Sequence, residues 1–373
     1  MKKIVLIALL LLSACTAGHK PYTGPTDTLA QDLVAFPVSN SIDLVMVGDA
    51  IVHSNLYSDA RLSGGGYDFT GMLDLIKPLV EPYDLGYYNQ ETILGGSKLG
   101  VSNYPRFNSP QEFGDAMLDA GFNLISLANN HTNDIGTKGI LSADAYWKTK
   151  DAITTGAFAT QAESEAVIVH ELNGIKFGFL SYTYGINGTY LAPENQFMVN
   201  RVSKEKMKAD CDALRPLVDV LIVAVHFGSE YQNYPNSYQK SVVNALVEDG
   251  VDIIIGNHAH AIEPIQWIGK TLVYYALGNF ISGQNGTAQL IGLTSAITIT
   301  KTVTGNTSQI TLNNLKVDLN YTYYDSRKLN VRVYPWDKVT TKLLPDKAVW
   351  EAHFLEIVNA YGADITFGSV QKD

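Results

Sequence analysis

Residues 251–260 of this chain read VDIIIGNHAH, an apolar run that ends in two histidines separated by one alanine. A short run rich in β-branched residues predicts a β-strand that is covered on both faces. Gly256 permits a sharp turn where this strand ends. His258 and His260 would diverge by about 200° on a helix, whereas an extended segment or a tight loop can turn both toward one point. The segment therefore predicts a buried strand whose tip presents two imidazoles.

The same order, an apolar run followed by a polar tip, occurs at four other places in the chain. These tips are Gly48-Asp49, Asn89-Gln90-Glu91, Asn129-Asn130-His131 and His226. In open α/β sheets, ligands bind beyond the carboxyl ends of the strands, where loops converge on a rigid support. A hydrolytic metal centre needs carboxylates and neutral imidazoles, with one position open for a water molecule whose pKa the cation lowers. The five tips together predict such a centre.

Strands and helices alternate from residue 42 onward. Apolar runs predict strands over 42–47, 85–88, 122–128, 220–225, 251–255, 272–277, 290–300 and 309–317, and helical periodicity predicts helices over 69–79, 111–120, near 242–247 and over 347–361. Asn173-Gly174 joins the apolar runs 166–172 and 175–182, which is the signal of a two-residue antiparallel hairpin. The chain is therefore predicted to be an α/β protein with mixed, not purely parallel, strand pairing.

Composition limits the classes of function. The chain has 373 residues, of which 46% are hydrophobic and 17% charged, so it is globular and large enough for one large α/β domain or two small ones. No repeat, low-complexity tract or internal linker marks a division. A net charge of −10 argues against nucleic acid or anionic lipid headgroups as partners. No nucleic-acid partner is therefore expected.

The N-terminus resembles a bacterial lipoprotein signal. Two lysines precede an apolar run over 4–12, too short to span a bilayer, and Leu12-Ser13-Ala14-Cys15 follows at once. This predicts a signal peptide over 1–14, acylation of Cys15, and a Pro- and Gly-containing, lipid-anchored flexible tether over 15–40. Thr16 favours the outer membrane in a cell that has one. An ordinary secretory signal with an incidental cysteine is the alternative. Acylation of Cys15 would leave only Cys211, which excludes an intramolecular disulfide.

Six groups of residues occur in order between positions 42 and 284. They are Gly48-Asp49 with His53, Asn89-x-Glu91, Asn129-Asn130-His131-x-x-Asp134-x-Gly136, His226-Phe227-Gly228-x-Glu230-Tyr231, Gly256-x-His258-x-His260 and Leu277-Gly278-Asn279-Phe280. Together they resemble the poly-γ-glutamate capsule biosynthesis (CapA-type) family. The resemblance implies an architecture similar to that of calcineurin-like metallophosphoesterases: a four-layer α/β/β/α sandwich with two mixed central sheets. We expect this domain over 41–345, with a C-terminal helix over 346–373 packed on it.

The resemblance also implies a two-metal site. Its ligands would be Asp49 and His260 for one ion, Asn130, His226 and His258 for the other, and Glu91 in place of the bridging carboxylate. The chain departs from the phosphoesterase pattern, because Ile51 stands where those enzymes carry a histidine and Asn-x-Glu replaces their Gly-Asp-x-x-Asp. His53 could fill the gap as a ligand or could orient another ligand through a hydrogen bond. Such a mixed ligand set suits Zn, Mn or Fe better than Mg or Ca.

The remaining site residues have less direct roles. By the resemblance, His131 would be catalytic, as a general acid or as a stabiliser of developing negative charge. Asn89 and Asp134 are candidates for ligands or for groups that orient ligands. Glu230, Tyr231 and Asn279 are candidates for substrate contact, although the first two could equally lie on a solvated loop.

Each tip also has a purely structural interpretation. Asp49 could cap the next helix, Asn129-Asn130 could form a turn, and His226 could be a core histidine with satisfied hydrogen bonds. His170 and His353 are assigned to structure.

Three functions remain open from the sequence. The first is an exported, envelope-located enzyme that attacks a glutamyl amide of a capsule polymer or transfers the chain to an acceptor. The second is a phosphoesterase acting on a phosphorylated surface or periplasmic substrate. The third is a non-catalytic subunit that binds polymer or capsule synthesis and export partners. Clustered carboxylates and imidazoles would be destabilising without a cation, which argues against the third. The resemblance, not the residues, favours glutamyl chemistry.

Overall fold

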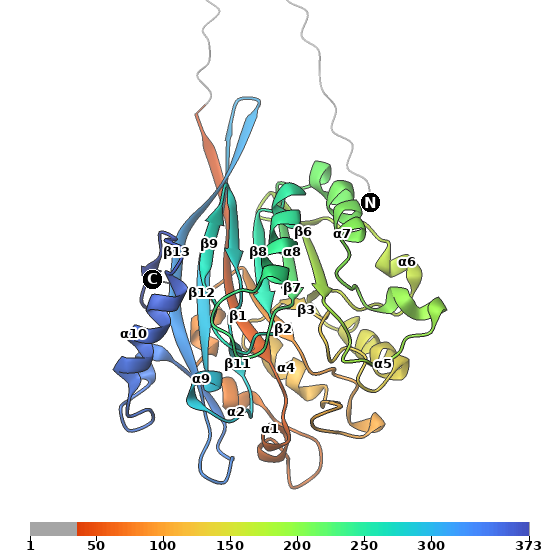
Figure 1. The fold of residues 1–373 in the computed structure, drawn as a ribbon, viewed down its shortest axis with the longest axis vertical. Coiled ribbons are helices and arrows are strands. Elements are labelled where there is room, and N and C mark those ends of the chain that lie inside the picture. Colours follow the sequence, from red (N-terminus) through yellow and green to blue (C-terminus); the bar gives the residue numbers. More distant parts are fainter. Residues whose placement is uncertain (1–35, 373) are drawn as a thin grey trace, which may run out of the picture. The chain divides into compact units, whose positions relative to one another are not determined.

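The computed structural model describes residues 36–372, and the chain from Pro37 onward forms one compact unit (Figure 1). The predicted signal peptide, Cys15 and the tether up to residue 35 lie outside the described residues. Strand β1 begins at Val38, so residues 38–40, assigned above to the tether, belong to a strand. Between residues 36 and 372, no helix combines the length and the apolar character needed to cross a membrane.

The first sheet is mixed and has the strand order β14-β13-β12-β1-β2-β3-β4, with β11 beside β1 and β15 beside β13. Its strands are β1 (Val38–Ala50), β2 (Leu85–Gln90), β3 (Leu124–Ser126), β4 (Ile153–Thr155), β11 (Asn279–Ile281), β12 (Ile291–Thr304), β13 (Thr307–Tyr323), β14 (Arg332–Pro335) and β15 (Thr366–Phe367). Strands β1 to β4 run parallel, whereas β12 pairs with β1 antiparallel.

The second sheet has the order β5-β6-β7-β8-β10-β9. Its strands are β5 (His170–Leu172), β6 (Ile175–Thr183), β7 (Val220–His226), β8 (Ile253–Asn257), β9 (Ile265–Ile268) and β10 (Thr271–Tyr274). Asn173 and Gly174 both have positive φ, 51° and 74°, and join β5 to β6 as the predicted hairpin. Strands β6, β7, β8 and β10 run parallel, whereas β5 pairs with β6 antiparallel, so this sheet is mixed as well.

Helices flank both sheets. They are α1 (Ser54–Asp59), α2 (Thr70–Leu73), α3 (Lys77–Val80), α4 (Glu112–Asp119), α5 (Thr137–Trp147), α6 (Gln161–Ser164), α7 (Lys204–Leu214), α8 (Ser237–Glu248), α9 (Thr287–Leu290) and α10 (Lys347–Val358). Short 3-10 turns occur at η1 (Ser97–Leu99), η2 (Pro193–Met198), η3 (Arg215–Leu217) and η4 (Trp336–Lys338). The predicted helix over 69–79 is divided into α2 and α3, because Pro78 cannot donate a hydrogen bond within a continuing helix but fits the first turn of a new one.

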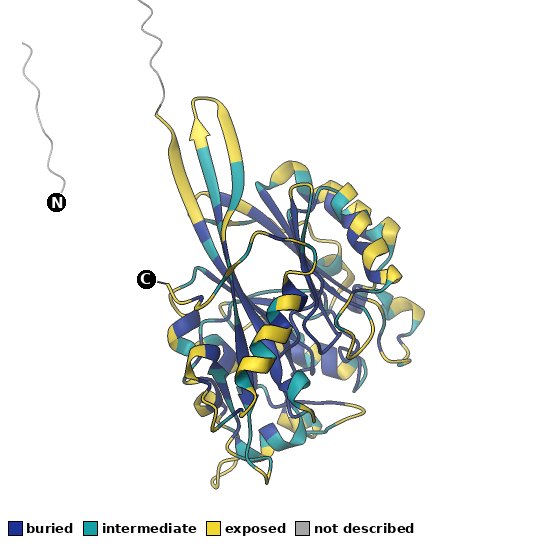
Figure 2. Ribbon diagram, turned by 60° about the vertical axis from the view of Figure 1, so that its left-hand side comes forward, coloured by how far each residue is buried: buried dark blue, intermediate teal, exposed yellow. Residues whose placement is uncertain are grey.

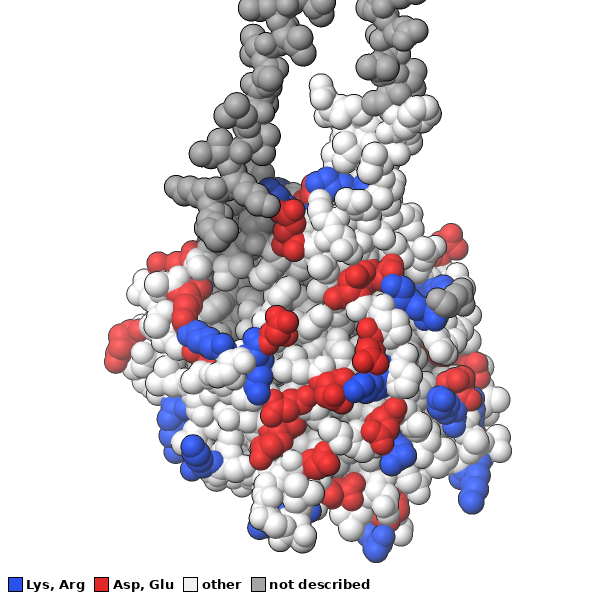
Figure 3. Space-filling view, turned by 180° about the vertical axis from the view of Figure 1, so that it is seen from behind, with Lys and Arg blue, Asp and Glu red and all other residues white. Residues whose placement is uncertain are grey.

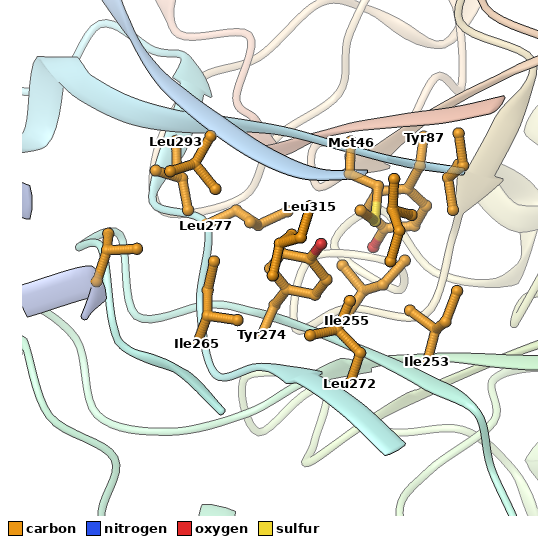
Figure 4. Close-up of a cluster of buried hydrophobic side chains, with 14 of the residues drawn as sticks. Met46, Tyr87, Ile253, Ile255, Ile265, Leu272, Tyr274, Leu277, Leu293 and Leu315 are labelled. Carbon is orange, nitrogen blue, oxygen red and sulfur yellow. The ribbon is translucent and has the colours of Figure 1, made fainter. Parts of the chain in front are cut away.

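Alternation along β1 places the sheets and helices in layers. Leu44 and Met46 share a buried cluster with Ile253 and Ile255 of the second sheet (Figure 4). Val45, on the opposite face of the strand, packs in a separate cluster with side chains of α1 to α5. A third cluster joins the outer face of the second sheet to α7 and α8. The predicted four-layer α/β/β/α sandwich with two mixed sheets is therefore confirmed and is consistent with a metallophosphoesterase-like fold.

Strands β1, β12 and β13 continue past the body of the sheet as a projecting arm. The pairs Val38↔Val303 and Thr304↔Thr307 lie at its end. Figure 2 shows that the arm is largely exposed, in contrast to the buried strands below it. On the face seen in Figure 3, acidic side chains are spread over the body and basic side chains lie among them. The strand ends that carry the polar tips lie at the opposite end of β1 from this arm.

Candidate metal centre

Both sheets contribute polar tips to one site. Asp49 lies at the end of β1, Glu91 directly follows β2, His226 ends β7, and His258 and His260 directly follow β8. All five are at most 4% exposed. The carboxyl ends of parallel strands in the two packed sheets point to the same edge of the sandwich, which is why residues more than 200 positions apart meet there.

Two glycines let the backbones approach each other at this edge. A Cβ on Gly48 would lie 1.9 Å from the carbonyl oxygen of Gly278, and a Cβ on Gly256 would lie 1.9 Å from that of Tyr275. Any side chain at either position would therefore collide with backbone. The close approach sets Asp49 beside the strand that carries Asn279, and the two residues are register partners in β1 and β11.

Glu91 is the central carboxylate of the site. Its side chain is fully buried, and neither carboxylate oxygen has a hydrogen-bond partner among the described residues. Oε1 lies 3.5 Å from Nε2 of His260 and 3.8 Å from Nε2 of His226. A buried carboxylate with unsatisfied oxygens is costly unless a cation neutralises it. The surroundings of Glu91 thus meet the requirement for a metal ligand.

Asp49 is held in a fixed orientation by both sheets. Its Oδ1 accepts a hydrogen bond of 2.8 Å from the side-chain amide of Asn89, and its Oδ2 accepts one of 3.1 Å from the backbone N–H of His258. Asn89 also places its amide nitrogen 3.2 Å from Nδ1 of His226. Asn89 therefore links Asp49 to His226.

The two histidines after β8 have unusual backbone conformations. His258 has φ +91° and His260 has φ +50°, a region that residues other than glycine seldom adopt. Nδ1 of His260 donates a 2.9 Å hydrogen bond to Oδ1 of Asn279, which leaves Nε2 directed to Glu91. Nδ1 of His258 has no hydrogen-bond partner among the described residues. Such backbone conformations are held at functional sites by the surrounding structure.

Two groups of side chains could each hold a metal ion. Glu91, His258 and His260 form one group, and Asp49, Glu91 and His226 form the other; in each group one ligand atom per residue lies within 4.8 Å of the others. Glu91 belongs to both groups, as expected of a bridging carboxylate.

The candidate ligands that were expected to share an ion lie close to one another. Nδ1 of His260 lies 3.4 Å from Oδ2 of Asp49, and the rings of His226 and His258 are 4.8 Å apart between centroids. His226 also lies within reach of Asp49. Oδ1 of Asn130 lies 2.9 Å from Nε2 of His226, so Asn130 adjoins the group that contains Asp49. The residues present therefore fit one or two divalent cations.

Burial and neighbouring charges together set the protonation of the side chains at this site. It lowers the pKa of His258 to about 3 and that of His226 well below its usual value, so both rings are neutral, as metal ligands must be. Burial raises the pKa of Glu91. Burial would lower the pKa of His260, but the carboxylates of Glu91 and Asp49 raise it to about 9.

His131 lies beside the metal groups but has a separate set of partners. Its Nδ1 donates a 2.7 Å hydrogen bond to Oδ2 of Asp134, and its ring meets the ring of Phe107 edge-on at 4.8 Å. Oδ2 of Asp134 also accepts from the backbone N–H of Phe107 at 2.7 Å. Asp134 is thus placed to orient His131 and is absent from both metal groups. Nε2 of His131 makes no contact with Asp134 and lies 3.4 Å from the amide nitrogen of Asn187.

A cavity of about 600 Å³ opens over the site. Its lining includes Glu91, His131 and His260, together with Glu230 and Tyr231 from the loop after β7. This volume lies within the range of small-molecule binding sites. The structure therefore places Glu230 and Tyr231 at the cavity.

His53 and Asn279 are placed differently from each other. His53 also lines the cavity, and the backbone N–H of Gly283 donates a 3.0 Å hydrogen bond to its Nδ1. His53 belongs to neither metal group. Asn279 does not line the cavity and instead lies behind His260, which it orients.

Comparison with known proteins identifies the family. A family model described as "Bacterial capsule synthesis protein PGA_cap" matches residues 43–284. The chain belongs to this family. The resemblance deduced from the six motifs is thereby confirmed, and all the predicted metal-site and cavity residues, from Asp49 to Asn279, lie inside the matched region.

Two relatives of the chain carry related names. Capsule biosynthesis protein CapA of Bacillus anthracis is 25% identical over 297 residues, which cover 76% of this chain and 68% of the relative. PGA biosynthesis protein CapA of Bacillus subtilis is 29% identical over 172 residues, 46% of this chain and 45% of the relative. The second alignment thus spans less than half of that protein. A solved structure of a hypothetical protein from Thermus thermophilus has a TM-score of 0.40 at 14% identity, covering 73% of this chain and 99% of that chain.

Three residues near the candidate site were not predicted from the sequence. The amide nitrogen of Asn187 lies 3.4 Å from both ring nitrogens of His131, and Oδ1 of Asn187 accepts a 3.2 Å hydrogen bond from Asn130. The ring of Tyr184 lies 4.6 Å from that of His258. Both come from the loop after β6, which has no polar tip of the kind that marks the other strands. Lys328 lines the cavity from a loop beyond the family-matched region.

Proposed function

We propose that this chain is an exported, lipid-anchored protein of the cell envelope whose divalent-metal centre hydrolyses or transfers glutamyl amide bonds of a poly-γ-glutamate capsule polymer. The family and the names of two relatives support poly-γ-glutamate as the substrate. The lipoprotein-like N-terminal sequence supports the location. Capsule synthesis or export proteins would be its partners. The bound ions would be Mn, Zn or Fe, because imidazole ligands suit these metals.

One observation carries the catalytic part of the proposal. Glu91 is fully buried, has no hydrogen-bond partner for either oxygen among the described residues, and lies in both groups that could hold a metal. A purely polymer-binding protein would gain nothing from an unsatisfied carboxylate in its interior, where it is destabilising without a cation. When bound, divalent cations would supply Lewis-acid polarisation of the scissile carbonyl and a lowered pKa for an attacking water molecule.

The chain's own residues would do the rest. Asp49, Glu91, His226, His258 and His260 would hold the cations, with Asn130 beside them. Hydrogen bonds from Asn89 and to Asn279 orient Asp49 and His260, so the ligands need little rearrangement on binding.

Proton transfer to the leaving amine would fall to His131. Asp134 accepts the hydrogen bond from Nδ1 and so orients the ring, with Nε2 left to give its proton to the amine. Asn187 and Phe107 restrict the rotation of the same ring. General acid catalysis of this kind contributes about 10²- to 10⁴-fold to a rate.

Metal analysis and paired assays test the proposal. We would measure metal content of the purified protein and turnover of poly-γ-glutamate and of a generic phosphodiester. His131→Ala should retain metal and lose turnover, whereas His258→Ala should lose both. His353→Ala, at an exposed histidine of α10, is the matched control and should change neither. Turnover of the phosphodiester without turnover of poly-γ-glutamate would instead support a phosphoesterase. A purified protein that contains no metal and turns over neither substrate would refute the proposed enzymatic function.

A further inference from the structure

The cavity over the metal groups contains one positively charged side chain that has no acidic partner. Lys328 is the only Lys or Arg of residues 36–372 in the lining, and no ion pair joins its ammonium to a carboxylate within that range. Two carboxylates, those of Glu91 and Glu230, share the lining with it. A half-buried ammonium on a ligand-sized cavity is available to an anionic group that enters the cavity.

The protein holds this ammonium in place with neutral groups. Nζ of Lys328 donates a 2.6 Å hydrogen bond to Oδ1 of Asn285 and lies 3.4 Å from the carbonyl oxygen of Gly283. It also lies 5.4 Å from the ring centroid of Tyr324. These contacts orient the charge without neutralising it, because an amide oxygen, a carbonyl oxygen and a ring face carry no net charge.

The backbone around Lys328 also helps to hold this side chain in place. Lys328 has φ +59°, a conformation uncommon for lysine, and its N–H donates to the carbonyl oxygen of Asp325 at 2.8 Å. Oδ1 of Asp325 accepts a 3.0 Å hydrogen bond from the N–H of Leu329. The turn over 325–329 therefore holds Lys328 in a conformation that the free chain would seldom adopt.

The loop that contacts Lys328 also contacts the metal site. Gly283 donates its N–H to His53, and Oε1 of Gln284 accepts a 2.9 Å hydrogen bond from Asn279, the residue that orients His260. The hydroxyl of Tyr324 donates to the carbonyl oxygen of Gln284 at 2.6 Å. The segment 283–285 thus ties the turn that carries Lys328 to the residues around the metal groups, and Lys328, Glu91 and His260 line the same cavity.

We propose that Lys328 is a substrate-binding residue that binds a free carboxylate of the substrate. This inference rests on the proposed function: a γ-linked glutamate chain keeps one α-carboxylate free on every residue, so an amide bond near the metal groups is always accompanied by nearby carboxylates. Lys328 would bind one of them and select a chain whose α-carboxylates are free over a chain in which they are amidated. It would also offset the repulsion that Glu230 exerts on such a polymer.

Equilibrium binding by the full-length protein tests this role independently of turnover. The probes are a dye-labelled γ-linked glutamate oligomer and the same oligomer with its α-carboxylates amidated. Binding is measured in EDTA, where neither hydrolysis nor a bound cation contributes. We expect the wild-type protein to bind the free-acid oligomer about tenfold more tightly than the amide, with the preference reduced at high salt.

Variants identify the group responsible. Lys328→Gln should remove the preference, and Lys328→Arg should retain it. Asn285→Asp, which puts a carboxylate on the ammonium itself, should remove the preference with Lys328 still present. Lys342→Gln makes the same charge change at an exposed lysine outside the cavity and should retain it. Thermal melting verifies that each variant is folded.

The outcomes separate this inference from the proposed function. A wild-type protein without the preference, or a preference that survives both Lys328→Gln and Asn285→Asp, overturns the role of Lys328. Failure to cleave poly-γ-glutamate despite the expected binding pattern counts against the glutamyl chemistry alone.

Discussion

Replacing Glu91 with glutamine tests the metal centre most directly. Glu91 belongs to both groups that could hold an ion, so Glu91→Gln removes a charged ligand from each while it conserves side-chain volume. Loss of even an indirect partner of a metal ligand lowers metal affinity by 10- to 100-fold, and loss of a direct ligand should cost at least as much. The variant should therefore bind metal about 100-fold more weakly than the wild-type protein.

The effect on stability follows from that change in affinity. At a free metal concentration of about 1,000 times the wild-type dissociation constant, binding stabilises the wild-type fold by about 4.1 kcal/mol. The variant, at about 10 times its own dissociation constant, would gain only about 1.4 kcal/mol. For a folded unit that extends from Pro37 to the C-terminus, an unfolding entropy of about 2.1 cal/mol/K per residue converts these values to increases in Tm of about 6 °C and 2 °C.

The assay is thermal unfolding after removal of metal, repeated with Mn²⁺, Zn²⁺ and Fe²⁺. Without metal, Glu91→Gln removes a carboxylate that has no hydrogen-bond partner among the described residues, but it also removes a charge that raises the pKa of His260. The increase in Tm on adding metal is therefore measured for each protein against its own metal-free Tm. Glu263→Gln is the matched control: Glu263 is equally buried, lies in neither metal group, and should leave the metal-induced increase intact. An equal increase in Tm for Glu91→Gln and the wild-type protein would refute the assignment of Glu91.

Three further predictions concern neighbouring groups. Asp134→Asn should lower turnover by about 10²-fold or more at unchanged metal content, because His131 loses the carboxylate that orients its ring; turnover and metal analysis of the same preparation check this. Asn279→Ala should weaken metal binding by about 10- to 100-fold in a chelator competition, because His260 loses its 2.9 Å hydrogen bond. Burial raises the pKa of Glu263 to about 8, above its unfolded value of about 4.3, so the folded state retains a proton that the unfolded chain releases between these pH values. The free energy of unfolding should fall by up to roughly 5 kcal/mol as pH rises through that window, and denaturant unfolding should show that Glu263→Gln removes this fall.

Much of the architecture was predictable because it depends on local patterns. The apolar runs of β1, β7 and β8, the Asn173-Gly174 turn and the polar tips after the strands were identified correctly from the sequence. Helix 69–79 was divided at Pro78, and β3 proved shorter than 122–128. In the second case the carbonyl oxygen of Leu127 accepts a hydrogen bond from the hydroxyl of Thr132, so the chain turns away from the sheet before the apolar run ends.

The types of side chain at the site were easier to predict than their contacts. Spacing along the chain indicated that Asp49, Glu91 and the histidines converge, and the structure brings them together. It did not indicate that His260 donates a hydrogen bond to Asn279, because these two residues meet only through tertiary packing. Asn187 and Lys328 were missed because each lies in an irregular loop, four or five residues beyond the end of the preceding strand and not directly at its tip.

The order of residues along the chain was enough to establish an α/β sandwich, the edge at which its polar tips gather, and the kinds of side chain available there. Strand periodicity and turn chemistry act over a few residues, so they can be deduced without knowing the rest of the fold. Three features arise from contacts between distant segments: Glu91 belongs to both candidate metal groups, Asn279 orients His260, and Lys328 lines the cavity. Such contacts depend on packing across the whole sandwich, where small shifts of a strand decide which atoms come within bonding distance.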